Sequence, residues 1–126
     1  MTEYYDLGFA KVEIKDDFLK NTIAEGFLVK PEHNKLLLEF VKKYFNNKPF
    51  VYISNRINSY SVDPTVYHET TKIDNLIGIA VVSKNHRQRK LTELESKCFQ
   101  KRIKYFTDIS RALEWKNELL EKNIDF

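Results

Sequence analysis

The sequence predicts an α/β fold: a mixed, mostly parallel sheet of about five strands that opens with an antiparallel hairpin and carries helices on both faces. Two observations support this prediction. Short apolar runs alternate with stretches whose apolar residues recur every three or four positions, which is the pattern of strands joined by helices. The run Leu76–Val82 is apolar throughout, as is typical of a strand that is covered on both faces.

The N-terminal third predicts a hairpin followed by a helix. Residues 5–9 and 10–14 alternate in opposite phases, so we expect a single strand that bends or bulges at Phe9 and Ala10. Two aspartates at residues 16–17 predict a turn, and a return strand should cover residues 18–25. Pro31 is a favoured first helical residue. It starts a predicted helix over residues 31–45, whose apolar stripe should cover one face of the sheet.

The rest of the chain alternates between strands and helices. A strand is expected over residues 50–54, then a polar loop, then a helix over residues 64–75 with Asp63 as its N-cap. Residues 76–82 are expected to form the central strand. Thr92 and Glu95 match a capping box, which predicts the start of the next helix. A last strand over residues 102–106 leads to a helix capped by Thr107 or Asp108. Helical crossovers require parallel strands, and residues 1–126 should form one domain.

Composition restricts the class of protein. The 126 residues are 42% hydrophobic and include only three glycines and three prolines, so a compact domain is expected rather than a disordered or fibrous chain. The single cysteine, Cys98, cannot form an internal disulfide; it is predicted to be a buried thiol in a helix and fits a reducing compartment. The first residues lack the basic and apolar segments of a signal peptide. We therefore expect a cytoplasmic protein without membrane insertion.

Positive charge is concentrated in the second half of the chain. The net charge is +3, and residues 84–90 are predicted to form a basic loop. Arg87, Arg89 and Lys90 could meet phosphate, anionic lipid or an acidic partner, or could belong to a solvated connector that keeps the protein soluble. Nucleic-acid binding would need more excess charge and a recognisable reading module, so it is not expected.

A polar segment over residues 55–64 follows the apolar strand, at the place where α/β sheets usually bind ligands. Its side chains are rich in hydrogen-bonding groups. The candidate binding residues are Asn55, Arg56, Asn58, Ser59, Tyr60, Ser61 and Asp63. The guanidinium of Arg56 could clamp a carboxylate or phosphate, or pair internally with Asp63. Alternatively, the short polar side chains satisfy the loop backbone while Tyr60 packs on the domain.

No catalytic residue, metal site or cofactor is predicted. The glycines stand at positions 8, 26 and 78, so no glycine-rich phosphate loop is present. The three histidines lack metal-ligand spacing. A hydrolase that uses Ser59 or Ser61 with His68 would need a nucleophile elbow and an oxyanion glycine, and the sequence has neither. We expect a protein that is not an enzyme.

The order of elements and the ending at residues 105–115, which reads Tyr-Phe-Thr-Asp-Ile-Ser-Arg-Ala-Leu-Glu-Trp, resemble the SpoIIAA-like branch of the STAS superfamily. The resemblance covers nearly the whole chain and implies a regulatory module that binds a protein partner. In anti-sigma factor antagonists of that superfamily, a serine before a helix is phosphorylated. The related CRAL-TRIO fold implies a second role, the carriage of a small apolar ligand or lipid.

The polar loop departs from the antagonist pattern. The Asp-Ser-Ser-Gly motif is absent, so the phosphorylation mechanism is not carried over. A phosphate on Ser59 or Ser61 would be favoured by the nearby helix N-terminus and opposed by Asp63, and its occurrence stays open. The partners left open are a protein, a small apolar ligand and, through an exposed aromatic patch, a second copy of the chain.

Overall fold

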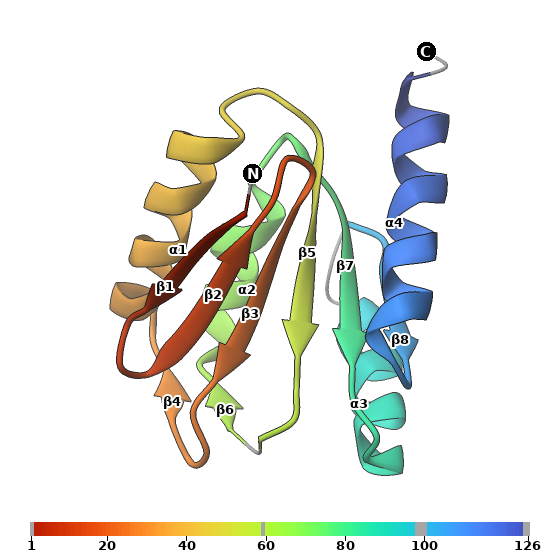
Figure 1. The fold of residues 1–126 in the computed structure, drawn as a ribbon. Helices are drawn as coiled ribbons and strands as arrows, with labels where there is room; N and C mark the ends of the chain where they lie inside the picture. Colours follow the sequence, from red (N-terminus) through yellow and green to blue (C-terminus); the bar gives the residue numbers. More distant parts are fainter. Residues whose placement is uncertain (1, 59, 98–100, 125–126) are drawn as a thin grey trace.

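The computed structural model describes residues 2–58, 60–97 and 101–124 (Figure 1). Ser59 and Cys98 lie outside the described residues. A six-stranded sheet has the order β1-β2-β3-β5-β7-β8, and β4 and β6 form a separate two-stranded sheet. The elements are β1 (Glu3–Asp6), β2 (Ala10–Ile14), β3 (Phe18–Ile23), β4 (Leu28–Val29), α1 (Pro31–Tyr44), β5 (Phe50–Asn55), β6 (Ser61–Val62), α2 (Pro64–Thr71), β7 (Leu76–Val82), α3 (His86–Ser96), β8 (Ile103–Phe106) and α4 (Ile109–Ile124). The predicted fold class is confirmed.

The predicted bent strand is in fact two strands. Strands β1 and β2 pair antiparallel, and the chain reverses between them at Gly8, whose φ is +86°. A side chain is disfavoured in that conformation, whereas glycine adopts it readily. The turn is closed by the backbone N–H of Leu7, which donates to the carbonyl of Ala10 over 2.8 Å. The opening unit is therefore a three-stranded meander, and the main sheet has six strands where about five were expected.

The second half of the sheet is parallel, as predicted from the helical crossovers. Strand β3 pairs with β5, β5 with β7, and β7 with β8, all in parallel register. Six of the seven residues of β7 are buried, which confirms that this strand is covered on both faces. Its predicted central position was wrong, because β7 lies next to the edge strand β8 and the middle of the sheet is β3 and β5.

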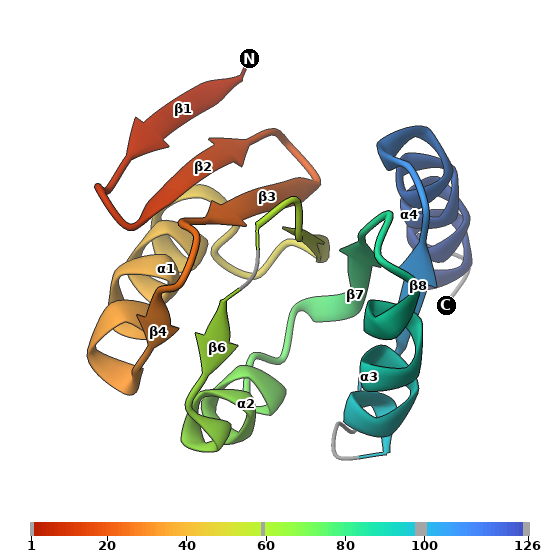
Figure 2. The ribbon, with the colours of Figure 1, turned by 90° about the horizontal axis from the view of Figure 1, so that it is seen from below.

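The two faces of the sheet carry different helices (Figure 2). Helices α1, α2 and α3 lie on one side and α4 on the other. The predicted stripe of α1 is confirmed, because Leu37, Val41 and Phe45 are buried against the first face. On the second face, Ala112 and Leu119 of α4 are buried against β5 and β7. None of the described helices is long and apolar enough to cross a membrane.

Helix α3 begins earlier than predicted. Its N-cap is Asn85, whose side-chain oxygen accepts from the backbone N–H of Arg87 over 3.0 Å. The expected basic loop is thus the beginning of a helix. Thr92 is not a cap: it is buried within the helix, and its hydroxyl donates to the carbonyl of Gln88 over 2.8 Å. The capping-box pattern gave the wrong start because Asn85, seven positions before the buried residue Thr92, supplies an equally good N-cap.

Candidate functional site

A cavity of about 80 Å³ lies between the sheet and helices α1, α2 and α3. Most of its lining is aliphatic or aromatic, and four of the eight polar side chains gather at the end nearest α3 and the loop after β5. The apolar lining residues are Leu19, Ile23, Val29, Leu37, Leu38, Val41, Phe50, Val62, Val66, Ile73, Leu76, Ile79 and Ile103. The polar ones are Asn21, Asn34, Tyr52, Ser54, Arg56, Tyr60, Thr70 and Glu95. A mostly apolar cavity with a few grouped polar residues is the usual form of a small-molecule site.

Strand β5 sets the polarity of the cavity wall. Alternate residues of a strand share one face, and on this face Phe50, Tyr52, Ser54 and Arg56 line the cavity in that order. Phe50 is fully buried and stacks on Phe45 of α1, with ring centroids 4.3 Å apart. The wall therefore changes from hydrocarbon to hydroxyl to guanidinium along one strand and the residue that follows it.

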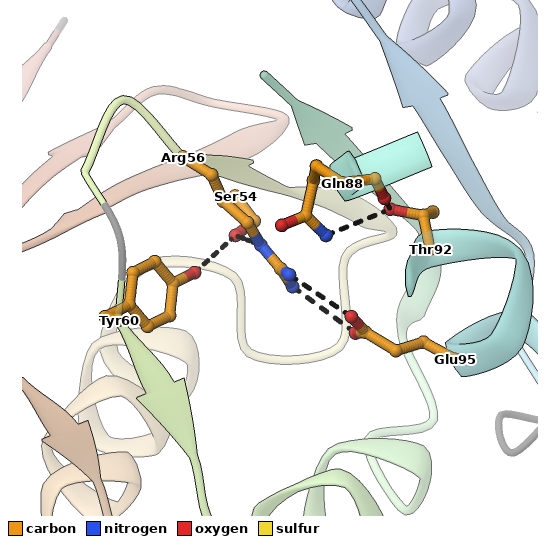
Figure 3. A network of polar contacts seen from close by, with 6 residues as sticks. All are labelled: Ser54, Arg56, Tyr60, Gln88, Thr92 and Glu95. Carbon is orange, nitrogen blue, oxygen red and sulfur yellow. Dashed lines mark hydrogen bonds and ion pairs between the residues drawn. The ribbon is translucent and has the colours of Figure 1, made fainter. Parts of the chain in front are cut away.

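Arg56 forms the centre of a polar network at the end of the cavity (Figure 3). Its guanidinium makes two hydrogen bonds to the carboxylate of Glu95, of 3.2 and 3.3 Å. Its Nε donates to the hydroxyl of Ser54 over 3.0 Å, and that hydroxyl also bonds the Tyr60 hydroxyl over 3.0 Å. The Arg56 and Glu95 side chains are only 13% and 15% exposed, so this ion pair is largely removed from water and its geometry is that of a bidentate clamp.

Asn21 adds a second polar position, on the neighbouring strand β3. Its side chain is 1% exposed, and its Nδ2 donates to the hydroxyl of Tyr52 over 2.8 Å. The Oδ1 atom is buried and has no hydrogen-bond partner. Buried amide oxygens without a donor are costly and uncommon, and here the costly group borders the cavity.

Most of the predicted loop residues form hydrogen bonds within the domain. The side chain of Asn55 donates to the hydroxyl of Thr22, and that of Asn58 donates to the carbonyl of Ile23. Asp63 caps α2, as predicted, by accepting from the backbone N–H of Thr65 over 3.0 Å. For Arg56 the sequence left open an external carboxylate or phosphate and an internal pair with Asp63; the structure shows an internal pair with Glu95. Ser61 is exposed in β6.

Local hydrogen bonds lower the pKa of two aspartates, one in the loop after β5 and one at the start of α4. The backbone N–H and the hydroxyl of Thr65 both stabilise ionised Asp63 and lower its pKa below the ordinary value of 3.8. At the start of α4, the Ser110 hydroxyl and the Arg111 backbone N–H lower the pKa of Asp108 in the same way. Both carboxylates are therefore charged at neutral pH, where they complement the helix N-termini.

The predicted anion patch is placed on α3. Arg87, Arg89 and Lys90 are all exposed there, and Arg89 lies 3.9 Å from Glu93 one turn later. None of the three lines the cavity. Whether this patch meets an anionic partner stays a prediction.

Sequence reasoning missed Asn21, Tyr52, Ser54 and Glu95. One signal was present in β3: Asn21 occupies the same phase as Leu19 and Ile23, so it is a polar residue on an apolar face. No local signal marked Glu95, since it lies 39 residues from Arg56 and meets it only through the packing of α3. Among the described residues, no three histidine, cysteine, aspartate or glutamate side chains are grouped to hold a metal ion.

Comparison with known proteins supports the fold and nothing finer. No family model matches the sequence, and no curated protein matches it. Among solved structures, an uncharacterised protein of the DUF3478 family from Shewanella loihica PV-4, described as having a SpoIIAA-like fold, superposes with a TM-score of 0.58. The match covers 91% of this chain and 94% of the other at 15% identity. The expected SpoIIAA-like fold is thereby confirmed.

Proposed function

We propose that this SpoIIAA-like domain is a non-catalytic binding protein for a small, largely apolar ligand that occupies the cavity between the sheet and helices α1 and α2. The observation that carries this proposal is the cavity itself: about 80 Å³ of space remains in a domain whose other face is filled by side chains. Protein interiors are normally packed without such space. A lining of aliphatic side chains favours hydrocarbon over water.

The arrangement of polar groups supports binding rather than catalysis. The Arg56 guanidinium is engaged by Glu95 and by Ser54, and among the described residues no histidine lines the cavity. Catalysis of acyl transfer would need a nucleophile beside a general base, and Ser54 instead bonds an arginine and a tyrosine hydroxyl. These groups are suited to orienting a ligand.

Native mass spectrometry of the freshly purified protein tests the proposal. We expect a bound mass that is released when the protein is unfolded. Val66→Phe should abolish the bound mass, because Val66 of α2 is 6% exposed and lines the cavity. His68→Ala, an exposed position on the same helix, is the matched control and should retain it. A wild-type protein that carries no added mass, and that takes up no apolar compound when one is supplied, would contradict the proposal.

A second candidate function is docking of a regulatory protein partner on the loop after β5. It is favoured by Ile57, which is 73% exposed at this loop. Ile57 stands between the polar residues Arg56 and Asn58, and an apolar centre within a polar rim is the usual composition of a protein interface. Ile57→Ser should then release a specific partner in pull-down experiments while the melting temperature stays unchanged. Equal recovery of that partner by Ile57→Ser and wild type would exclude this role for the loop.

A further inference from the structure

We infer that the cavity ligand carries a carboxylate, which binds Arg56 by taking the place of Glu95. This inference rests on the proposed function and names the chemical class of its ligand: a short hydrocarbon chain that ends in a carboxylate. In this view Glu95 is an internal competitor. Its carboxylate occupies the guanidinium in the empty protein, and the ligand's carboxylate occupies it in the complex.

The first support is that Arg56 is oriented by groups other than Glu95. Nε donates to Ser54, whose hydroxyl is also bonded by Tyr60. The guanidinium carbon lies 5.6 Å from the centroid of the Tyr60 ring, within the range of a cation–π contact. A guanidinium fork held on one side by a strand residue and an aromatic ring presents its other side to a carboxylate in a fixed direction. The orientation of the Arg56 guanidinium is therefore the same whether Glu95 or a ligand supplies the carboxylate.

The second support is the weak apolar attachment of α3. Thr92 is the buried residue of this helix, while Leu91 and Leu94 are 51% and 59% exposed. The side of α3 that faces Arg56 carries polar side chains, namely Gln88, Thr92 and Glu95 (Figure 3). Withdrawal of Glu95 would thus expose little hydrocarbon, so the helix can release the guanidinium at a low hydrophobic cost.

The third support is the continuity between the clamp and the cavity. Arg56 follows Ser54, Tyr52 and Phe50 along one cavity wall, so a ligand head at Arg56 places its tail against Tyr52 and Phe50. A cavity of roughly 150 Å³ holds benzene; the 80 Å³ present here is about half of that volume, and withdrawal of the Glu95 side chain adds to it. The enlarged space suits a carboxylate with a short tail of about three to five carbons.

Exchange of Glu95 for the ligand keeps the Arg56 guanidinium paired with one carboxylate. A neutral ligand would leave the Arg56–Glu95 pair in place and gain only apolar contacts. An anionic ligand gains the bidentate contact but must first displace Glu95, which weakens its apparent affinity in proportion to the occupancy of the internal pair. Removal of the Glu95 charge should therefore strengthen binding of the carboxylate, the opposite of what removal of an ordinary contact residue does.

The experiment compares hexanoate with 1-hexanol, which share a chain and differ in the head group, by isothermal titration or by chemical-shift titration. In wild type Glu95 competes for the guanidinium, so we expect hexanoate and hexanol to bind with affinities that differ by less than about 5-fold. Glu95→Gln should raise the affinity for hexanoate about 10-fold and leave that for hexanol within about 2-fold. Glu93→Gln is the matched control: the same charge is removed from the same helix at a position whose side chain is 68% exposed, and neither affinity should change.

Arg56→Gln should weaken the binding of hexanoate while hexanol still binds. Because this variant leaves Glu95 buried without its partner and could unfold, the double variant Arg56→Gln/Glu95→Gln provides the same test without an unpaired charge. A hexanoate affinity in Glu95→Gln that is unchanged or lower than in wild type, or an equally high hexanoate affinity without Arg56, would each overturn the inference and leave the proposed function intact. Failure of both compounds to bind any of these proteins would contradict the proposed function itself.

Discussion

The two faces of the sheet are formed by the same strands but are packed differently. On the face covered by α4, Val51 and Ile53 of β5 and Ala80 of β7 are fully buried. A Cβ added at Gly78 would lie 2.6 Å from a methyl of Leu119 and 3.1 Å from the Trp115 ring, so the packing between β7 and α4 leaves no room for an added methyl group at this position. On the opposite face, the alternate residues of β5 border the cavity.

This difference shows how a strand can separate stability from binding. Successive side chains point to opposite faces, so a change at one residue of β5 affects packing against α4 and a change at the next affects the cavity. The filled face can hold the domain together while the other keeps space and a buried ion pair, both of which cost free energy. Three predictions test whether the faces are separable in this way.

The largest effect is expected from matched isoleucine truncations. Ile53 faces α4 and is fully buried, whereas Ile79 on the adjacent strand is 5% exposed and borders the cavity. We expect Ile53→Ala to lower the free energy of unfolding by about 4 kcal/mol and Ile79→Ala by about 2 to 3 kcal/mol, because a residue beside a cavity has fewer contacts to lose. Urea denaturation of both variants measures this difference. An equal cost, or a higher one for Ile79→Ala, would show that the two faces are equally well packed.

A smaller effect is expected from substitutions that enlarge a side chain instead of truncating it. Val51→Ile adds a methyl group to the filled face, where Val51 is fully buried, and should destabilise the domain by about 1 to 2 kcal/mol through overpacking. Val66→Ile adds the same group to the cavity and should change stability by less than about 0.5 kcal/mol while it weakens binding of 1-hexanol. Denaturation and ligand titration on the two variants give both quantities. If Val66→Ile destabilised as strongly as Val51→Ile, the cavity would not be available space.

The fold class could be predicted from the sequence, whereas some of the turns and helix ends could not. The fold class followed from periodicity, since apolar residues repeat every two positions in strands and every three or four in helices. Two of the errors arose at short-range choices: Gly8, whose positive φ makes a turn where a bulge was expected, and Asn85, which caps α3 before the expected Thr92. In both places two local structures were chemically acceptable, and tertiary packing decided between them.

About half of the polar network around Arg56 was predicted from the sequence. Arg56 and Tyr60 were identified from the polar loop, and their partners were not. Glu95 reaches Arg56 from another helix, and a pair of that kind depends on how α3 packs on β8, which periodicity does not report. The cavity depends on the summed volumes of side chains from six strands and three helices, so no single stretch of sequence could indicate it.

The smallest effects are expected from the two aspartate N-caps, one on each face. Asp63 caps α2 over the cavity, and Asp108 accepts from the backbone N–H of Arg111 at the start of α4. Each has a lowered pKa, so its contribution to stability is present above the ordinary value of 3.8 and is lost as the pH falls through the lower value in the folded protein. Asp63→Ala and Asp108→Ala should each lower the melting temperature by a few degrees at pH 7, and this difference from wild type should shrink as the pH falls below 3.8.

Ligand binding distinguishes these two caps. Asp63→Ala loosens the helix that carries Val66 and Thr70 over the cavity and should weaken the binding of 1-hexanol at neutral pH. Asp108→Ala acts on the filled face and should leave that binding unchanged at an equal loss in melting temperature. Because the two caps are matched in chemistry and cost, an equal effect on binding would mean that the cavity responds to the stability of the whole domain rather than to the helix above it.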